Sequence, residues 1–138
     1  SRPIADAFAS GADRITPGHE DTLADSIAVG APRNWAKALR AVRRTGGTMV
    51  TVSDDEILGA IRELARTTGV FGEPAGVTGF AGFRKMAESG ALGRGERVAF
   101  VVTGNGLKDA KSARKAVGSP LAVAPDIDEL VPLLPRLD

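Results

Sequence analysis

The chain contains no cysteine, and it has no long apolar run. Without cysteine it can form no disulfide and offers no thiolate for catalysis. A helix that spans a membrane needs roughly 20 consecutive apolar residues, and no segment approaches that length. The 18 basic side chains almost balance the 17 acidic ones, so no net field favours nucleic acid or anionic lipid. We therefore expect a cytoplasmic protein without nucleic-acid or membrane partners.

The length of 138 residues suffices for one hydrophobic core, so we expect a single domain over residues 1–138. The first residues form no charged leader followed by an apolar stretch, which is the pattern of a secretion signal. They also include no initiator methionine. From this start we expect a fragment or a processed chain of a longer protein.

Caps and apolar periodicity predict the helices. Ser53 and Glu56 have the spacing of a capping box, which begins a helix, and Gly69 is placed to end it. The same kinds of signal predict further helices over residues 3–10, 34–44, 75–89 and 109–117. A short closing helix can follow Asp126, with Pro132 cutting it short.

Two short segments, residues 48–52 and 98–102, have the composition of strands, and residues 121–123 could form one last short strand. The run 98–102 is apolar throughout, which is typical of a strand covered on both faces. Strands that alternate with helices form βαβ units, so we expect a three-layer α/β fold with a mostly parallel sheet. Glycines recur every third residue in the helix 75–89, and we expect another backbone to approach them closely.

The segment 103–106 directly follows the predicted apolar strand and ends it. In parallel α/β sheets, ligands bind at this end of the strands. The hydroxyl of Thr103 can donate a hydrogen bond, and Gly104 and Gly106 let backbone approach a flat or anionic ligand. A tight turn without ligand explains the same short pattern equally well.

A longer string is more specific. Residues 101–109 read VVTGNGLKD, and upstream blocks read GAPRNW at 30–35, VSDDEIL at 52–58 and GVFGEPA at 69–75. In this order the blocks resemble those of threonine synthase, a pyridoxal-phosphate enzyme of the tryptophan synthase β-type fold, fold type II. The resemblance implies a lyase of threonine biosynthesis that converts O-phosphohomoserine and water to threonine and phosphate. It places the chain in the C-terminal part of the large cofactor-binding domain.

The resemblance also implies roles for individual residues. Thr103 would donate to the pyridine nitrogen of the cofactor, and the turn of Gly104, Asn105 and Gly106 would pack beside the ring. Glu73 matches an acid close to the cofactor. The alternative for Glu73 is a carboxylate that stabilises the start of the next helix.

Residues 23–30 occupy the place where chains of this family line the substrate. Asp25 and Ser26 are therefore candidates for the substrate side, although Ser26 is equally explained as a cap of a helix or turn. The string DSIAV at 25–29 looks more like serine/threonine dehydratases of the same fold. Elimination from serine or threonine thus remains an alternative reaction.

The Schiff-base lysine and the phosphate loop of the family precede the region that this chain matches. Its own lysines lie outside the family's lysine context, so we expect them on the surface and assign no catalytic residue. The resemblance then implies an N-terminal half as partner, an amino-acid substrate and, for the full-length enzyme, a homodimer. A non-catalytic stand-alone module is the third alternative. We expect no metal site, since His19 is the only histidine and has no neighbouring acid or sulfur ligands at metal spacing.

Overall fold

A computed structural model describes residues 1–134 of the chain. Within this range lie α1 (Pro3–Ala9), η1 (Asp25–Ile27), α2 (Trp35–Arg44), α3 (Asp54–Thr68), α4 (Pro74–Glu88), η2 (Gly106–Asp109), α5 (Ala110–Val117), α6 (Ile127–Leu130) and η3 (Val131–Leu133), where η denotes a 3-10 helix. The predicted helices are confirmed. The closing helix is a single turn, because η3 with Pro132 follows it directly. No helix in the described part combines the length and apolar character that crossing a bilayer requires.

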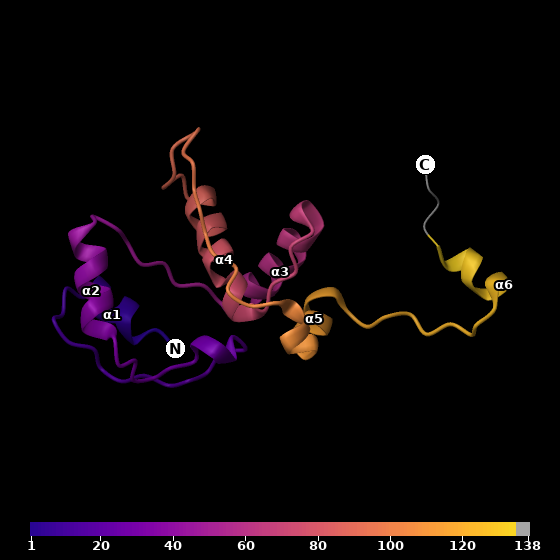
Figure 1. Cartoon of the computed structure of the whole chain (residues 1–138), viewed down its shortest axis with the longest axis horizontal. Helices are drawn as coiled ribbons and strands as arrows, with labels where there is room; N and C mark the ends of the chain where they lie inside the picture. The colour runs from indigo at the N-terminus through magenta and orange to yellow at the C-terminus, as the bar shows by residue number, and fades with distance from the viewer. Residues whose placement is uncertain (135–138) are drawn as a thin grey trace.

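Helices α3 and α4 form the centre of the molecule (Figure 1). Their facing sides bury the main core, which also takes in residues before η1 and from α5: Ala24, Ile57, Ala60, Ile61, Leu64, Val77, Phe80, Ala81 and Ala116. At one edge of this core the ring of Phe100 lies 5.3 Å from that of Phe80 and 6.2 Å from that of Phe83. The Phe83–Phe100 pair is stacked and the Phe80–Phe100 pair tilted, and such aromatic pairs add to the stabilisation from apolar burial. The segment before the 103–106 turn is thereby held on α4.

The predicted strands do not form among residues 1–134. Segments 48–52, 98–102 and 121–123 run without a neighbouring strand, and the described part holds one isolated antiparallel bridge, between Gly72 and Asn105. The expected parallel sheet is therefore not seen here. A strand exists only when another strand accepts and donates its backbone hydrogen bonds, and no second strand lies beside these segments. Apolar side chains stay exposed as a result, with Val101 at 77%.

The glycines of α4 lie where other segments approach the helix. A Cβ added at Gly76 would be 3.0 Å from the carbonyl oxygen of Gly104 and 3.1 Å from its nitrogen. At Gly79 the nearest atom would be the Cβ of Phe100, and at Gly82 the Cβ of Val50, both at 3.9 Å. The expected close backbone approach is thus confirmed at Gly76, whereas the other two glycines face side chains at ordinary contact distance.

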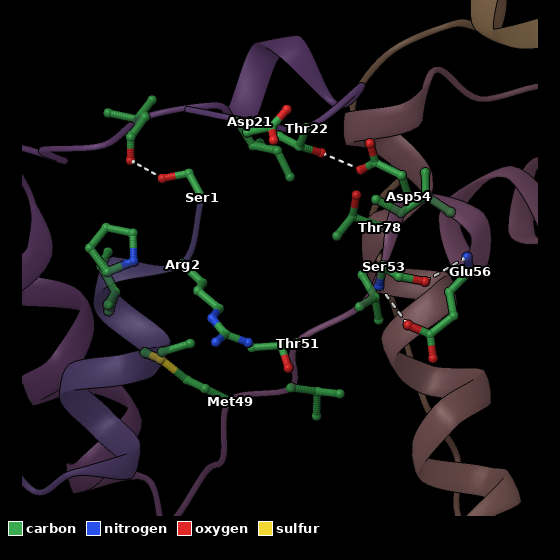
Figure 2. Close-up of a pocket in the computed structure, with 18 of the residues that line it drawn as sticks. Ser1, Arg2, Asp21, Thr22, Met49, Thr51, Ser53, Asp54, Glu56 and Thr78 are labelled. Carbon is green, nitrogen blue, oxygen red and sulfur yellow. Dashed lines mark hydrogen bonds between the residues drawn. The ribbon is translucent and has the colours of Figure 1, made fainter. Parts of the chain in front are cut away.

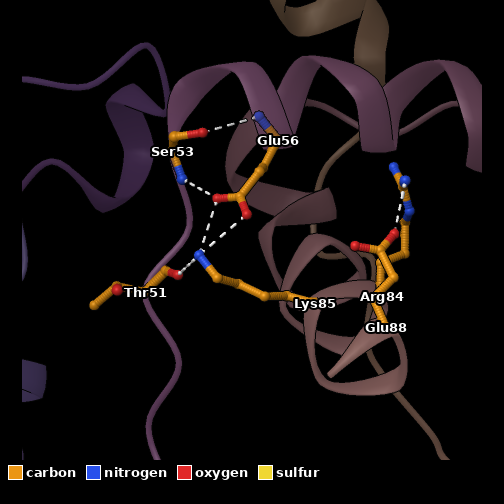
Figure 3. Close-up of polar contacts among 6 residues, drawn as sticks. All are labelled: Thr51, Ser53, Glu56, Arg84, Lys85 and Glu88. Carbon is orange, nitrogen blue, oxygen red and sulfur yellow. Dashed lines mark hydrogen bonds and ion pairs between the residues drawn. The ribbon is translucent and has the colours of Figure 1, made fainter. Parts of the chain in front are cut away.

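The capping box at the start of α3 is confirmed. The Ser53 hydroxyl accepts a hydrogen bond from the backbone N–H of Glu56 at 3.2 Å, and the Glu56 carboxylate accepts one from the N–H of Ser53 at 2.6 Å. Lys85 of α4 joins the group, since its Nζ lies 3.1 Å from the Glu56 carboxylate and donates to the carbonyl of Thr51 at 3.0 Å (Figure 3). The Ser53 backbone hydrogen bond, followed by Lys85, lowers the pKa of Glu56.

This lowered pKa predicts a pH-dependent contribution to stability. A carboxyl group whose pKa is lower in the folded than in the unfolded state stabilises the fold at any pH above its ordinary pKa, here 4.5. This contribution disappears as the pH falls through the pKa of the folded state. We expect Glu56→Gln to lower the free energy of unfolding at neutral pH and to have a smaller effect in acid. Urea unfolding at both pH values measures this, with Glu96→Gln at an exposed position as control. An equal effect of Glu56→Gln at both pH values would contradict the assignment.

Candidate functional site

Two loops that are distant in the sequence meet beside the start of α4. The backbone N–H of Glu73 donates to the carbonyl of Gly104 at 2.9 Å, and the N–H of Gly106 donates to the carbonyl of Phe71 at 3.0 Å. The structure thus brings Glu73 and the 103–106 turn together, as the sequence-based assignment of both to one site requires. We call this contact between residues 71–73 and 103–106 the loop junction.

The loop junction depends on glycine because side chains of the facing loop fill the space where a Cβ would stand. A Cβ on Gly104 would overlap the carboxylate of Glu73, and one on Gly106 would overlap the ring of Phe71. A Cβ on Gly72 would lie 2.6 Å from Val77, closer than real Cβ atoms approach their neighbours. The glycines that the sequence suggested for ligand approach therefore have a packing reason within the chain itself.

Glu73 has a buried and paired carboxylate. The residue is 7% exposed, and its two carboxylate oxygens lie 3.1 and 3.2 Å from Nζ of Lys108. Glu73 is the N-cap residue of α4, yet its side chain accepts no hydrogen bond from the first turn of that helix. Glu73 thus makes no side-chain capping bond, while its place at the N-terminus of α4 fits the alternative, a carboxylate that stabilises the start of this helix. Burial of a carboxylate is costly unless a partner compensates, and Lys108 is that partner.

The sequence alone did not single out Lys108, which we expected on the surface with the other lysines. Its side chain is 62% exposed, but its ammonium reaches back to Glu73 from η2. The pairing follows from the loop junction, because Glu73 and Lys108 lie 35 positions apart in the chain. No spacing rule within one helix or turn could have indicated it.

The two polar side chains of the 103–106 turn differ in whether they are already hydrogen-bonded within the chain. The side chain of Asn105 accepts a hydrogen bond from the N–H of Leu107 at 2.9 Å and so caps η2. Thr103 is exposed, and within residues 1–134 its hydroxyl has no hydrogen-bond partner. Its hydroxyl is thus free to donate to a ligand, which fits the role that the resemblance implies for it.

Asp25 and Ser26 lie in η1, and both are exposed. The segment before η1 is fixed to α3: the hydroxyl of Thr22 and the backbone N–H of Leu23 donate to the carboxylate of Asp54 at 2.6 and 2.9 Å. Asp54, in the first turn of α3, thus fixes the segment before η1 to this helix.

Ser26 lines an open cleft of about 910 Å³ between the N-terminal helices and the α3–α4 pair (Figure 2). Thr78 of α4, Ser53 and Asp54 also line it, and Figure 2 shows their side chains along one wall. Its lining includes neither Glu73 nor any residue of 103–106. The structure therefore groups Ser26 with the cleft and Thr103 with the loop junction, as two separate features. Two backbone hydrogen bonds define the loop junction, whereas the cleft is broad and open.

Lys85 and Asp109, two further charged side chains that could take part in chemistry, have structural partners in the described part of the chain. Within residues 1–134, no three histidine, aspartate or glutamate side chains are grouped so that they could hold a metal ion. Lys85 is engaged with Glu56 and Thr51, as described above. Asp109 caps α5 by accepting from the N–H of Ser112 at 2.9 Å, and hydrogen bonds from Ser112 lower its pKa.

Comparison with known proteins bears directly on these residues. The model of the family described as "Pyridoxal-phosphate dependent enzyme" matches residues 1–104, a range that includes Glu73 and Thr103. The chain is 42% identical over 131 residues to a threonine synthase of Methanosarcina acetivorans, an alignment that covers 94% of this chain and 32% of the relative. A threonine synthase of Methanocaldococcus jannaschii is 38% identical over 138 residues, covering 99% and 34%. A threonine synthase of a Bacillus species is 46% identical over 105 residues, covering 73% and 30%. The chain thus spans about a third of the length of these relatives.

The loop junction predicts that Gly104 tolerates no side chain. We expect Gly104→Ala to lower the free energy of unfolding by about 1–3 kcal/mol, the usual cost of overpacking a well-packed site, because the new Cβ displaces the paired carboxylate of Glu73. Gly79→Ala is the matched control, since its Cβ meets only Phe100 at 3.9 Å. Urea unfolding of both variants measures the difference. A Gly104→Ala variant as stable as Gly79→Ala would show that the junction is not packed as described.

Proposed function

Because the chain belongs to the family of pyridoxal-phosphate-dependent enzymes, we propose that it forms the C-terminal portion of an enzyme resembling threonine synthase. The complete enzyme would convert O-phosphohomoserine and water to threonine and phosphate. The observation that carries the proposal is the identity of 38–42% to threonine synthases along nearly the whole chain. Its site residues would belong to the large cofactor-binding domain, with the lysine and the phosphate loop supplied by the preceding half.

Thr103 is the proposed partner of the cofactor ring. When bound, pyridoxal phosphate supplies an electron sink for the reaction. The Thr103 hydroxyl would donate to the ring nitrogen as a neutral group, which moderates that sink and suits elimination and replacement chemistry. Gly104, Asn105 and Gly106 would lie beside the ring. The exposed hydroxyl of Thr103, next to a turn anchored by backbone hydrogen bonds, supports this assignment.

The proposal extends to the sheet and to the surroundings of the enzyme. Segments 48–52 and 98–102 would be strands of a mostly parallel sheet when the rest of the enzyme lies beside them. Their exposed apolar side chains support this, with Val98 at 46% and Val101 at 77%. An amino-acid substrate, a homodimer and a cytoplasmic location complete the proposal.

A second candidate keeps the cofactor but changes the reaction to elimination from serine or threonine, with release of ammonia and a keto acid. The segment 25–29 favours it, and the position of Ser26 on the wall of the cleft makes a substrate contact sterically open. In either reaction Asp25 and Ser26 would lie on the substrate side.

Assays of the complete enzyme separate the two reactions. We expect phosphate and threonine to form from O-phosphohomoserine at equal rates, and no ammonia to be released from serine or threonine. Ammonia release from threonine without conversion of O-phosphohomoserine would replace the leading proposal with the second one.

The role of Thr103 has a test of its own. We expect Thr103→Ala to lower kcat of the complete enzyme by roughly tenfold or more and to change the absorption spectrum of the bound cofactor, because the ring nitrogen loses its hydrogen bond, a loss of about 1.4 kcal/mol or more. Thr103→Ser keeps the hydroxyl and should retain most of the activity. Wild-type kinetics and spectrum in Thr103→Ala would reject the assignment.

A further inference from the structure

The ion pair of Glu73 and Lys108 packs against the turn that carries Thr103, and the function proposed above gives Lys108 no role. Glu73 touches the turn at Gly104, through its backbone N–H and through the carboxylate that fills the missing Cβ position. Lys108, beyond the turn, holds the same carboxylate through both oxygens. Glu73 therefore contacts the turn through both its backbone and its side chain, in addition to the hydrogen bond from Gly106 to Phe71.

The Glu73 carboxylate is both buried and charged. It is buried against Gly104, where water is scarce, yet as an ion it needs a compensating charge. Within residues 1–134 the only basic side chain within ion-pair distance of it is Lys108. Loss of that ammonium would favour movement of the carboxylate towards solvent. The space beside Gly104 would then be unfilled, and the turn would keep its two backbone hydrogen bonds to residues 71–73 but lose the contact with the carboxylate.

We propose that Lys108 is a positioning residue: by holding the Glu73 carboxylate against Gly104, it fixes the backbone that presents the Thr103 hydroxyl to the cofactor ring. This inference rests on the proposed function for the contact between Thr103 and the ring. Lys108 itself touches neither cofactor nor substrate in this account. It acts through Glu73 alone.

The complete enzyme tests the proposal with Lys108→Gln, the conservative variant Lys108→Arg and the control Lys115→Gln, which makes the same change at an exposed lysine of α5. The dissociation constant of pyridoxal phosphate and the absorption spectrum of the bound cofactor are measured. We expect Lys108→Gln to bind the cofactor about tenfold more weakly and to shift its spectrum in the same direction as Thr103→Ala. Lys108→Arg should restore both properties, and Lys115→Gln should behave as wild type.

A double variant separates the pair from two independent effects and guards against misfolding. Glu73→Gln is measured alone and together with Lys108→Gln; the double variant removes both charges, so no unpaired ion stays buried. We expect it to bind the cofactor about as weakly as either single variant. A loss equal to the product of the two single losses would show that the residues act independently, and wild-type binding in the double variant would show that the pair is dispensable. Either result overturns the inference.

The outcomes also distinguish this inference from the proposed function. A wild-type enzyme that binds no pyridoxal phosphate refutes the proposed function. A wild-type enzyme that binds it, with Thr103→Ala altered and Lys108→Gln identical to Lys115→Gln, refutes the positioning role of Lys108 alone.

Discussion

The hydrogen bond from the backbone of Glu73 to the carbonyl of Gly104, at 2.9 Å, connects the parts of this structure that bear on function. It joins the start of α4 to the turn that follows the 98–102 segment. Together with the bond from Gly106 to Phe71, it holds the two loops at the distance at which the Glu73 side chain fills the space over Gly104. The burial of that carboxylate, its pairing with Lys108 and the need for glycine at position 104 depend on this approach of the two loops.

The helices could be predicted from the sequence because their signals are local. The Ser53–Glu56 capping box and the left-handed Gly69, with φ of 74°, lie within or next to the helix that they delimit. The strands could not be obtained in the same way. Strand composition at 98–102 describes a segment that suits a sheet, but a sheet needs a partner strand, and none is present among residues 1–134. The segment packs instead on α4 through Phe100.

The candidate site, too, could be predicted only in part from the sequence. Resemblance to a family selected Thr103 and Glu73, and the structure places their loops in contact. The resemblance could not indicate Lys108, because its ion pair with Glu73 forms only when the two loops meet in the folded chain. Nor could it separate Ser26 from Thr103: one lines the open cleft and the other lies at the loop junction.

The central claim is that the turn at residues 103–106 receives the ring of pyridoxal phosphate. A crystal structure of the complete enzyme with its cofactor tests it most directly. The account predicts the hydroxyl oxygen of Thr103 at hydrogen-bond distance, about 2.7–3.0 Å, from the pyridine nitrogen. A ring nitrogen bound to a carboxylate, or a cofactor bound away from Thr103, would contradict it.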